Sequence, residues 1–147
     1  MYLVKMLNIL ASLFIFGVLI NCAHEFGHYY GGLVVGIDGY IKGMFYCYPS
    51  GLTPTAYQDI VVSLSAGLGI AVIYAGLYFV RKLSEQYSKW DMDDCFALLA
   101  VGIWQGLYAF SEVINWNYGS IIAAIAGFGI ALLVYGRPLL NWLKEEK

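Results

Sequence analysis

MLNILASLFIFGVLINCA, which occupies Met6–Ala23, is a run without a single charged side chain. A helix needs about 20 predominantly apolar residues to cross the hydrocarbon core of a bilayer, with a range of about 17–25. Three further uncharged runs of suitable length follow along the chain, and they cover Ile60–Val80, Cys95–Ser111 and Val113–Gly136. The sequence therefore predicts an all-α polytopic membrane protein with about four transmembrane helices.

The composition is that of a membrane protein rather than of a soluble domain. Of the 147 residues, 61% are apolar and 12% are charged, whereas a soluble domain carries about 25% charged residues. The net charge of −2 gives no indication of a nucleic-acid partner. The three cysteines, Cys22, Cys47 and Cys95, form no CxxC pair, so the sequence indicates neither a disulfide framework nor a cysteine zinc cluster.

The first apolar run continues beyond a short polar interruption, because Tyr29–Ile37 is apolar again. If Met6–Ile37 were one helix, it would be about 48 Å long at 1.5 Å per residue. The hydrocarbon core is only about 30 Å thick. We therefore expect this helix to tilt, to project beyond the bilayer, or to break near Gly31-Gly32, with the polar residues that precede Tyr29 inside the membrane.

The connection after this first helix differs from the others. Gly36–Tyr57 is rich in glycine and proline and contains the β-prone segments Tyr40-Ile41 and Met44-Phe45-Tyr46. This composition predicts a short β-hairpin or looped strands. Because the chain shows no repeat and no linker, residues 1–147 are interpreted as a single integral-membrane domain.

The basic residues predict the orientation in the membrane. Arg81–Asp94 is interpreted as a polar, solvated loop, and Gly136 followed by Arg-Pro predicts a helix stop before a charged tail, Arg137–Lys147. Alternate connections share a side, so both termini lie on the side of this loop. That side holds seven basic residues, namely Lys5, Arg81, Lys82, Lys89, Arg137, Lys144 and Lys147. The other side holds Lys42 alone, so the positive-inside rule predicts a multi-pass protein of the cell membrane with both termini cytoplasmic and with loops 36–57 and 112–119 outward.

One motif carries chemistry. Residues 24–28 read His-Glu-Phe-Gly-His, and the spacing places His24 and His28 on one helix face, where both can bind the same metal ion. Imidazole nitrogens suit Zn²⁺ at about 2.0–2.1 Å. Zinc lowers the pKa of a bound water toward about 7. Glu25 is adjacent and would act as the general base, taking a proton from that water and passing it to the leaving amine.

The alternative interpretation of the motif is a structural hydrogen-bonding cluster. An HExxH pattern arises by chance in about one of a few hundred chains of this length. Here, however, both histidines of the chain belong to the motif. A charged residue inside a membrane helix also costs about 2.5–3.5 kcal/mol, so such residues are functional by default. The context favours a metal site.

A catalytic zinc usually has three protein ligands and a water. Val34 stands where the last ligand of a longer HExxHxxGxxH pattern would lie, so the third ligand must come from elsewhere. On the predicted side of the membrane the candidates are Glu112, Asn115, Asn117 and Asp38, and Glu112 leads because it is the only carboxylate at membrane level in the last two helices. The most acidic cluster belongs to the solvated loop at the opposite membrane face and comprises Asp91, Asp93 and Asp94.

The residues around the motif resemble the site-2 protease family of intramembrane zinc metalloproteases. Ala23–His28, followed by Gly31–Gly36, is similar to the family's HExxH helix, and Gly36–Tyr57 is similar to its membrane-associated β-hairpin. Ser63–Gly69 resembles the Ala-Gly-Pro start of its second core helix, with leucine in place of the proline. The family takes its third ligand from an Asn-Pro…Asp-Gly segment. Glu112–Gly119 occupies the equivalent place here without either pair, so Glu112 or Asn117 would have to substitute.

This resemblance, which covers residues 10–80, implies a zinc metalloendopeptidase that hydrolyses peptide bonds in or next to the membrane. It implies Zn²⁺ as cofactor, and membrane lipid and a membrane-embedded or juxtamembrane polypeptide as partners. A substrate helix would unwind and add as an extended strand to an exposed edge. The alternatives are an inactive relative that binds membrane segments without cleavage, a metal-dependent membrane enzyme with another substrate, and a metal carrier or channel.

Overall fold

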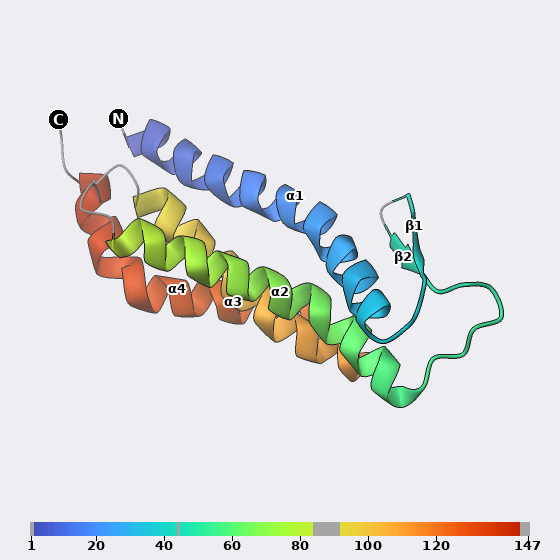
Figure 1. The fold of residues 1–147 in the computed structure, drawn as a ribbon. Helices are drawn as coiled ribbons and strands as arrows, with labels where there is room; N and C mark the ends of the chain where they lie inside the picture. Colours follow the sequence, from blue (N-terminus) through green and yellow to red (C-terminus); the bar gives the residue numbers. More distant parts are fainter. Residues whose placement is uncertain (1, 44, 84–91, 145–147) are drawn as a thin grey trace.

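The computed structural model describes residues 2–43, 45–83 and 92–144 (Figure 1). The elements in chain order are α1 (Tyr2–Val34), β1 (Tyr40–Lys42), β2 (Phe45–Cys47), α2 (Ala56–Leu83), α3 (Met92–Val113) and α4 (Gly119–Lys144). All four helices are long and apolar enough to cross a membrane. The prediction of a polytopic all-α protein with a hairpin after the first helix is therefore confirmed.

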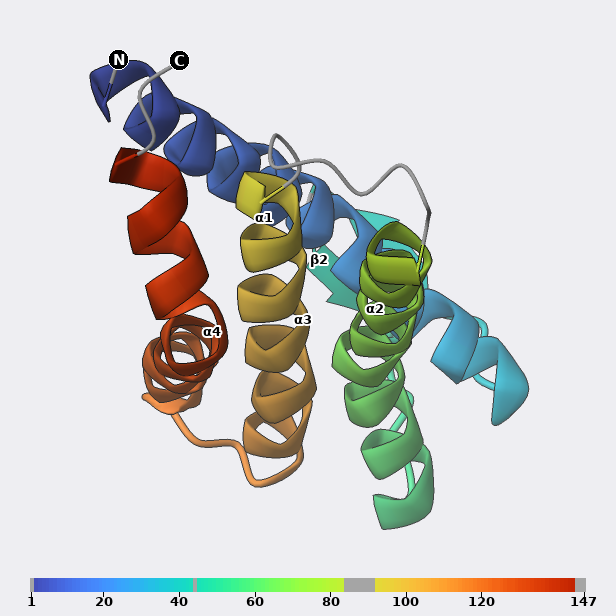
Figure 2. The ribbon, with the colours of Figure 1, turned by 90° about the vertical axis from the view of Figure 1, so that its left-hand side faces the viewer.

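The three helices α2, α3 and α4 stand in a row, and α1 runs obliquely across them (Figure 2). The first turn of α1 and the last turn of α4 lie at one end of this arrangement, and the hairpin lies at the other (Figure 1). Apolar side chains of α1, such as Leu3, Leu10 and Phe14, are exposed, which suits a surface that faces lipid. The core lies between the helices, where Ile20, Ile70 and other apolar side chains are buried.

α1 is one uninterrupted helix of 33 residues, so it does not break at Gly31-Gly32. At about 1.5 Å per residue it is about 50 Å long. The helix ends at Val34, and Gly36 just beyond it has a φ of 76°. The Ile37 N–H donates to the Gly32 carbonyl at 2.8 Å and the Gly36 N–H donates to the Leu33 carbonyl at 3.2 Å. This pair of bonds is a Schellman cap, which favours glycine because the backbone there is left-handed.

Small residues let the helices approach closely around the HExxH motif. A Cβ at Gly27 would lie 2.5 Å from the Ala66 Cα of α2, and a Cβ at Gly67 would lie 2.5 Å from the Gln105 carbonyl oxygen of α3. The Gly27 carbonyl also accepts a hydrogen bond from Ser65 Oγ at 2.9 Å. Close backbone approach of this kind is a main source of helix association in membranes. It brings the motif on α1 within side-chain reach of α3.

We expect Gly27→Ala to destabilise the protein by about 1–3 kcal/mol, because the added methyl group would overpack the contact with the α2 backbone. The matched control is Gly17→Ala on the same helix, where an added Cβ meets nothing within 4 Å. Alanine is the better helix former, so this control should be neutral or slightly stabilising. Thermal unfolding in one detergent measures both variants. Equal unfolding midpoints for the two would contradict the packing argument.

Two sequence predictions about helix ends are wrong. The predicted stop at Gly136 does not end the last helix, because α4 continues through Pro138 to Lys144. Leu139 and Trp142 are buried in the core, and the Trp142 carbonyl accepts a hydrogen bond from Lys5 Nζ. Tertiary packing thus holds the final turns, and a proline is tolerated in a membrane helix when neighbours satisfy the freed backbone groups.

The second error concerns the acidic cluster predicted to lie in a solvated loop. Asp93 and Asp94 lie in the first turn of α3, where carboxylates interact favourably with the helix dipole. Asp93 is only 8% exposed. Asp94 accepts hydrogen bonds from Ser12 Oγ at 3.1 Å and from Arg81 at 3.2 Å. Asp91 lies outside the described residues.

Candidate metal centre

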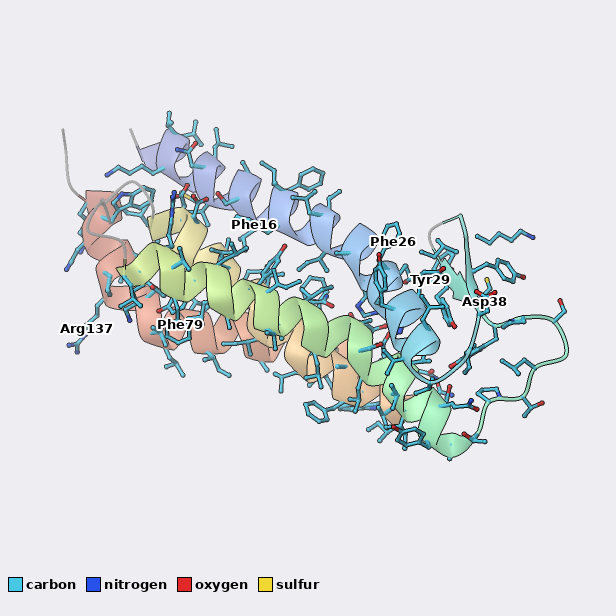
Figure 3. All side chains as sticks on the ribbon, in the orientation of Figure 1. Phe16, Phe26, Tyr29, Asp38, Phe79 and Arg137 are labelled. Carbon is cyan, nitrogen blue, oxygen red and sulfur yellow. The ribbon has the colours of Figure 1, made fainter. Side chains whose placement is uncertain are left out.

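Three side-chain atoms from two helices converge at the hairpin end of α1. His24 Nε2 and His28 Nε2 are 3.1 Å apart. Glu112 Oε1 lies 3.1 Å from His24 Nε2 and 3.7 Å from His28 Nε2. The two histidines are one helical turn apart on α1, and Glu112 belongs to the last turn of α3 rather than to the following loop. Figure 3 marks this end of the molecule by Tyr29 and Asp38, and the opposite end by Arg137.

The Nδ1 atoms of both histidine rings lie within hydrogen-bonding distance of oxygen acceptors. His28 Nδ1 lies 2.8 Å from the Val62 carbonyl oxygen, and His24 Nδ1 lies 3.1 Å from Gln105 Oε1. A carbonyl oxygen can only accept, so each Nδ1 carries the hydrogen. In the neutral rings each Nε2 then presents a lone pair, and the two lone pairs face each other and a carboxylate oxygen.

A cation held between these atoms would stabilise this arrangement. Without a proton or a metal ion between them, three lone-pair donors at these separations would repel one another, and His24 is only 6% exposed, so solvent would offset little of that repulsion. Glu112 Oε2 is also buried without a hydrogen-bond partner in the part of the chain that the structure describes. A tetrahedral zinc with ligands at about 2.0–2.1 Å separates its donors by about 3.3 Å. The residues present therefore fit a zinc ion.

Glu25 occupies a different position from Glu112. Glu25 Oε2 accepts a hydrogen bond at 2.6 Å from the Tyr46 main-chain N–H of β2. One ring nitrogen of His24, one of His28 and a carboxylate oxygen of Glu25 nevertheless all lie within 4.8 Å of one another. Glu25 is thus beside the convergent donors, and a hydrogen bond to the hairpin holds it there. This is a suitable place for a group that exchanges protons with a bound water.

A cavity of about 440 Å³ opens beside these residues. Its walls come from all four helices, the hairpin region and the connection between α3 and α4. Three carboxylates line it, those of Glu25, Asp59 and Glu112. Lipid supplies no water, so any hydrolysis within the bilayer needs a polar cavity of this kind.

The other predicted third ligands make no hydrogen bond or ion pair with either histidine among the interactions of the described residues. Asn115 and Asn117 line the cavity, but both are exposed residues of the loop after α3. Asp38 is exposed on the loop before β1 and is not among the described residues that line the cavity. Of the four candidates, Glu112 is the one that the fold brings to both histidines.

The hairpin region is tied to α2 as well as to α1. The Tyr48 hydroxyl donates to Asp59 Oδ1 at 2.8 Å, at the first turn of α2. Burial, together with the hydrogen bond to Asp59, raises the pKa of Tyr48 above its ordinary value. The hydroxyl therefore stays protonated at neutral pH and remains a donor that closes one wall of the cavity.

Sequence reasoning missed two residues of the site, Gln105 and Tyr108. Gln105 is 2% exposed and accepts the hydrogen bond from His24. The Tyr108 ring stacks on the His24 ring at a centroid separation of 5.5 Å. Gln105, Tyr108 and Glu112 follow one another on α3 at spacings of three and four residues, so they share one face of the helix. The signal that could have found them is a glutamine inside an otherwise apolar membrane helix, which is functional by default.

Gln105→Met should lower the affinity for zinc by about 10–100-fold, as is typical when an outer partner of a metal-bound histidine is lost. The substitution leaves His24 Nδ1–H without its acceptor, while the volume of the side chain is nearly kept. A competition titration with a chromogenic chelator measures the affinity. Phe110→Ala, on the exposed face of the same helix, is the control and should bind zinc like the wild type. An unchanged affinity in Gln105→Met would show that Gln105 does not orient the ligand.

Comparison of the chain with protein-family models, with curated proteins and with solved structures gives no match.

Proposed function

We propose that the protein is an intramembrane zinc metalloprotease that hydrolyses peptide bonds in or next to the membrane. The observation that carries the proposal is the convergence of His24 Nε2, His28 Nε2 and Glu112 Oε1 at 3.1–3.7 Å in a membrane helix bundle. The resemblance of the HExxH helix and the hairpin to the site-2 protease family supports it. The rival proposal is an inactive relative that binds membrane segments without cutting them.

The ligand set would be His24, His28 and Glu112. A bound zinc ion would supply Lewis acidity, which polarises a carbonyl oxygen and makes water more acidic. Glu25 accepts a proton from the attacking water as the new carbon–oxygen bond forms at the scissile carbonyl. It then delivers that proton to the nitrogen as the carbon–nitrogen bond breaks, so that one water yields a carboxyl group and an amine.

The side chains around the cavity suit the rest of the reaction. Asn115 and Asn117 line the cavity and carry amide donors of the kind that stabilise an oxyanion. The edge of the hairpin formed by β1 would offer a place where an unwound substrate segment can lie extended, which exposes its scissile carbonyl. The substrate class is therefore a membrane-embedded or juxtamembrane polypeptide.

The proposed orientation follows from the basic residues. The first turn of α1 and the last turn of α4 share one end of the bundle (Figure 1), and the positive-inside rule assigns that end to the cytoplasm. In a cell membrane the cavity would then open toward the outer face.

Isotope labelling tests the proposal directly. Purified, zinc-loaded protein is incubated with a set of single-span membrane polypeptides in H₂¹⁸O, and the products are analysed by mass spectrometry. A hydrolase produces fragments with one ¹⁸O at each new carboxyl terminus. Binding of the polypeptides without any fragment would contradict the proposal and favour the inactive relative.

A further inference from the structure

Among the described residues, one hydrogen bond connects the hairpin strands to the carboxylate of Glu25. Its donor is the main-chain N–H of Tyr46. In the hairpin, Tyr40 pairs with Cys47, Ile41 with Tyr46, and Lys42 with Phe45. Antiparallel pairs alternate between those that exchange hydrogen bonds and those that do not. Because the Tyr46 N–H donates to Glu25, Ile41 and Tyr46 form a pair without hydrogen bonds. The outer edge of β2 therefore faces α1.

The ring of Tyr46 lies in a slot made by two glycines. A Cβ at Gly32 would lie 2.6 Å from the Tyr46 hydroxyl oxygen, and a Cβ at Gly39 would lie 2.2 Å from it. Gly32 follows His28 by four residues, so it lies on the same face of α1 as the two histidines. The Tyr46 and His28 ring centroids are 6.0 Å apart. The slot thus places the ring one turn beyond the metal ligands.

The fit of this ring depends on shape rather than on the hydroxyl group. The Tyr46 hydroxyl oxygen is buried without a hydrogen-bond partner among the described residues. A buried polar atom of this kind contributes nothing favourable and can even cost free energy. What fixes Tyr46 is the absence of side chains at Gly32 and Gly39, together with the ring contact to His28.

We propose that Tyr46 is a positioning residue for Glu25: its ring sits in the Gly32–Gly39 slot, and its main-chain N–H then holds the Glu25 carboxylate beside the metal ligands. This inference rests on the proposed function, in which Glu25 is the proton acceptor. A hydrogen bond from a main-chain N–H to a carboxylate is short and strong because the acceptor is charged. A flexible glutamate next to His24 gains a fixed orientation from it, and a fixed orientation is what proton transfer requires.

Amide hydrogen exchange in the detergent-solubilised full chain tests the geometry without any activity assay. In wild type, the Tyr46 amide should exchange slowly although it lies on a strand edge. Glu25→Ala should accelerate its exchange by about 10-fold or more, since an edge amide without an acceptor is open to water. The Phe45 amide, which belongs to the ladder with Lys42, is the internal control and should change little. Equal Tyr46 exchange in wild type and Glu25→Ala would overturn the proposal.

Two glycine-to-alanine variants test the consequence for catalysis. Gly39→Ala fills the slot, so we expect kcat to fall by about 10–100-fold, as for a misplaced catalytic group, with KM and zinc content unchanged. Gly69→Ala on α2 is the matched control, because a Cβ added there meets nothing within 4 Å, and it should behave like the wild type. A rise in KM with kcat unchanged in Gly39→Ala would overturn the proposal, because it would assign the Tyr46 edge to substrate binding.

These measurements separate the two proposals. If the Tyr46 amide responds to Glu25→Ala but the chain neither binds zinc nor cleaves peptides, the contact stands and the protease function fails. If the chain binds zinc and cleaves peptides but the amide does not respond, the positioning role alone fails.

Discussion

Glu25→Gln should abolish peptide-bond hydrolysis while leaving one zinc ion bound per chain. A glutamine cannot take a proton from water, and loss of a positioned general base typically costs about 10²–10⁴-fold in rate. The amide oxygen of glutamine can still accept the hydrogen bond from the Tyr46 N–H. The hairpin should therefore keep its place, and the loss should fall on kcat. Initial rates of cleavage and elemental analysis of the same preparation measure both quantities.

Asp59→Asn is the matched control for that variant. Asp59 is a second carboxylate on the wall of the same cavity, and its Oδ1 accepts the hydrogen bond from Tyr48. In Asp59→Asn the side-chain amide oxygen can still accept that hydrogen bond, so activity should change by less than about 10-fold. Full activity in Glu25→Gln would refute the role of Glu25 as the base. Loss of zinc in Glu25→Gln would instead make Glu25 a ligand.

Glu112→Ala should lower the affinity for zinc by more than about 100-fold, which exceeds the effect typical of outer-shell partners. The substitution removes the only carboxylate oxygen within 3.7 Å of both histidine Nε2 atoms in the described chain. It should also remove most of the increase in thermal stability that added zinc produces in wild type, since that increase depends on [Zn²⁺]/Kd. Titration against a competing chelator and thermal unfolding with and without zinc provide the measurements.

Asn117→Ala and Asp38→Asn are the controls for Glu112, because sequence reasoning named both positions as alternatives. Each should retain the zinc affinity of the wild type. Normal zinc affinity in Glu112→Ala, combined with loss in either control, would mean that the loop after α3 or the hairpin moves to supply the third ligand.

The helices could be predicted from the sequence because an uncharged run of the right length is a local property. Their ends could not. Pro138 predicts a stop, yet α4 continues because Leu139 and Trp142 pack into the core. The acidic cluster predicts that Asp93 lies in a solvated loop, yet Asp93 is buried in the first turn of α3. Both errors have one physical cause: packing between segments distant in the chain overrides local propensity.

In the candidate site, too, some residues could be predicted from local sequence spacing, whereas others depend on packing between helices. The juxtaposition of His24 and His28 follows from helical spacing alone. Topology could only reduce the third ligand to a few candidates led by Glu112. The distance of Glu112 from the two histidines depends on how closely α3 packs against α1 and α2. Gln105 and Tyr108 act through contacts between helices, and the sequence carries only a weak signal for them. Tyr46 contacts Glu25 through its main-chain N–H. A main-chain contact leaves no signal in the side-chain pattern of the sequence.

Elemental analysis of detergent-purified wild-type protein beside His24→Ala tests the central claim most directly. The convergence of three lone-pair donors predicts about one zinc per wild-type chain and none in His24→Ala, since a catalytic zinc is held by three protein ligands. Wild-type protein without zinc after metal-replete purification, or equal zinc in both proteins, would contradict the assignment of a metal centre to His24, His28 and Glu112.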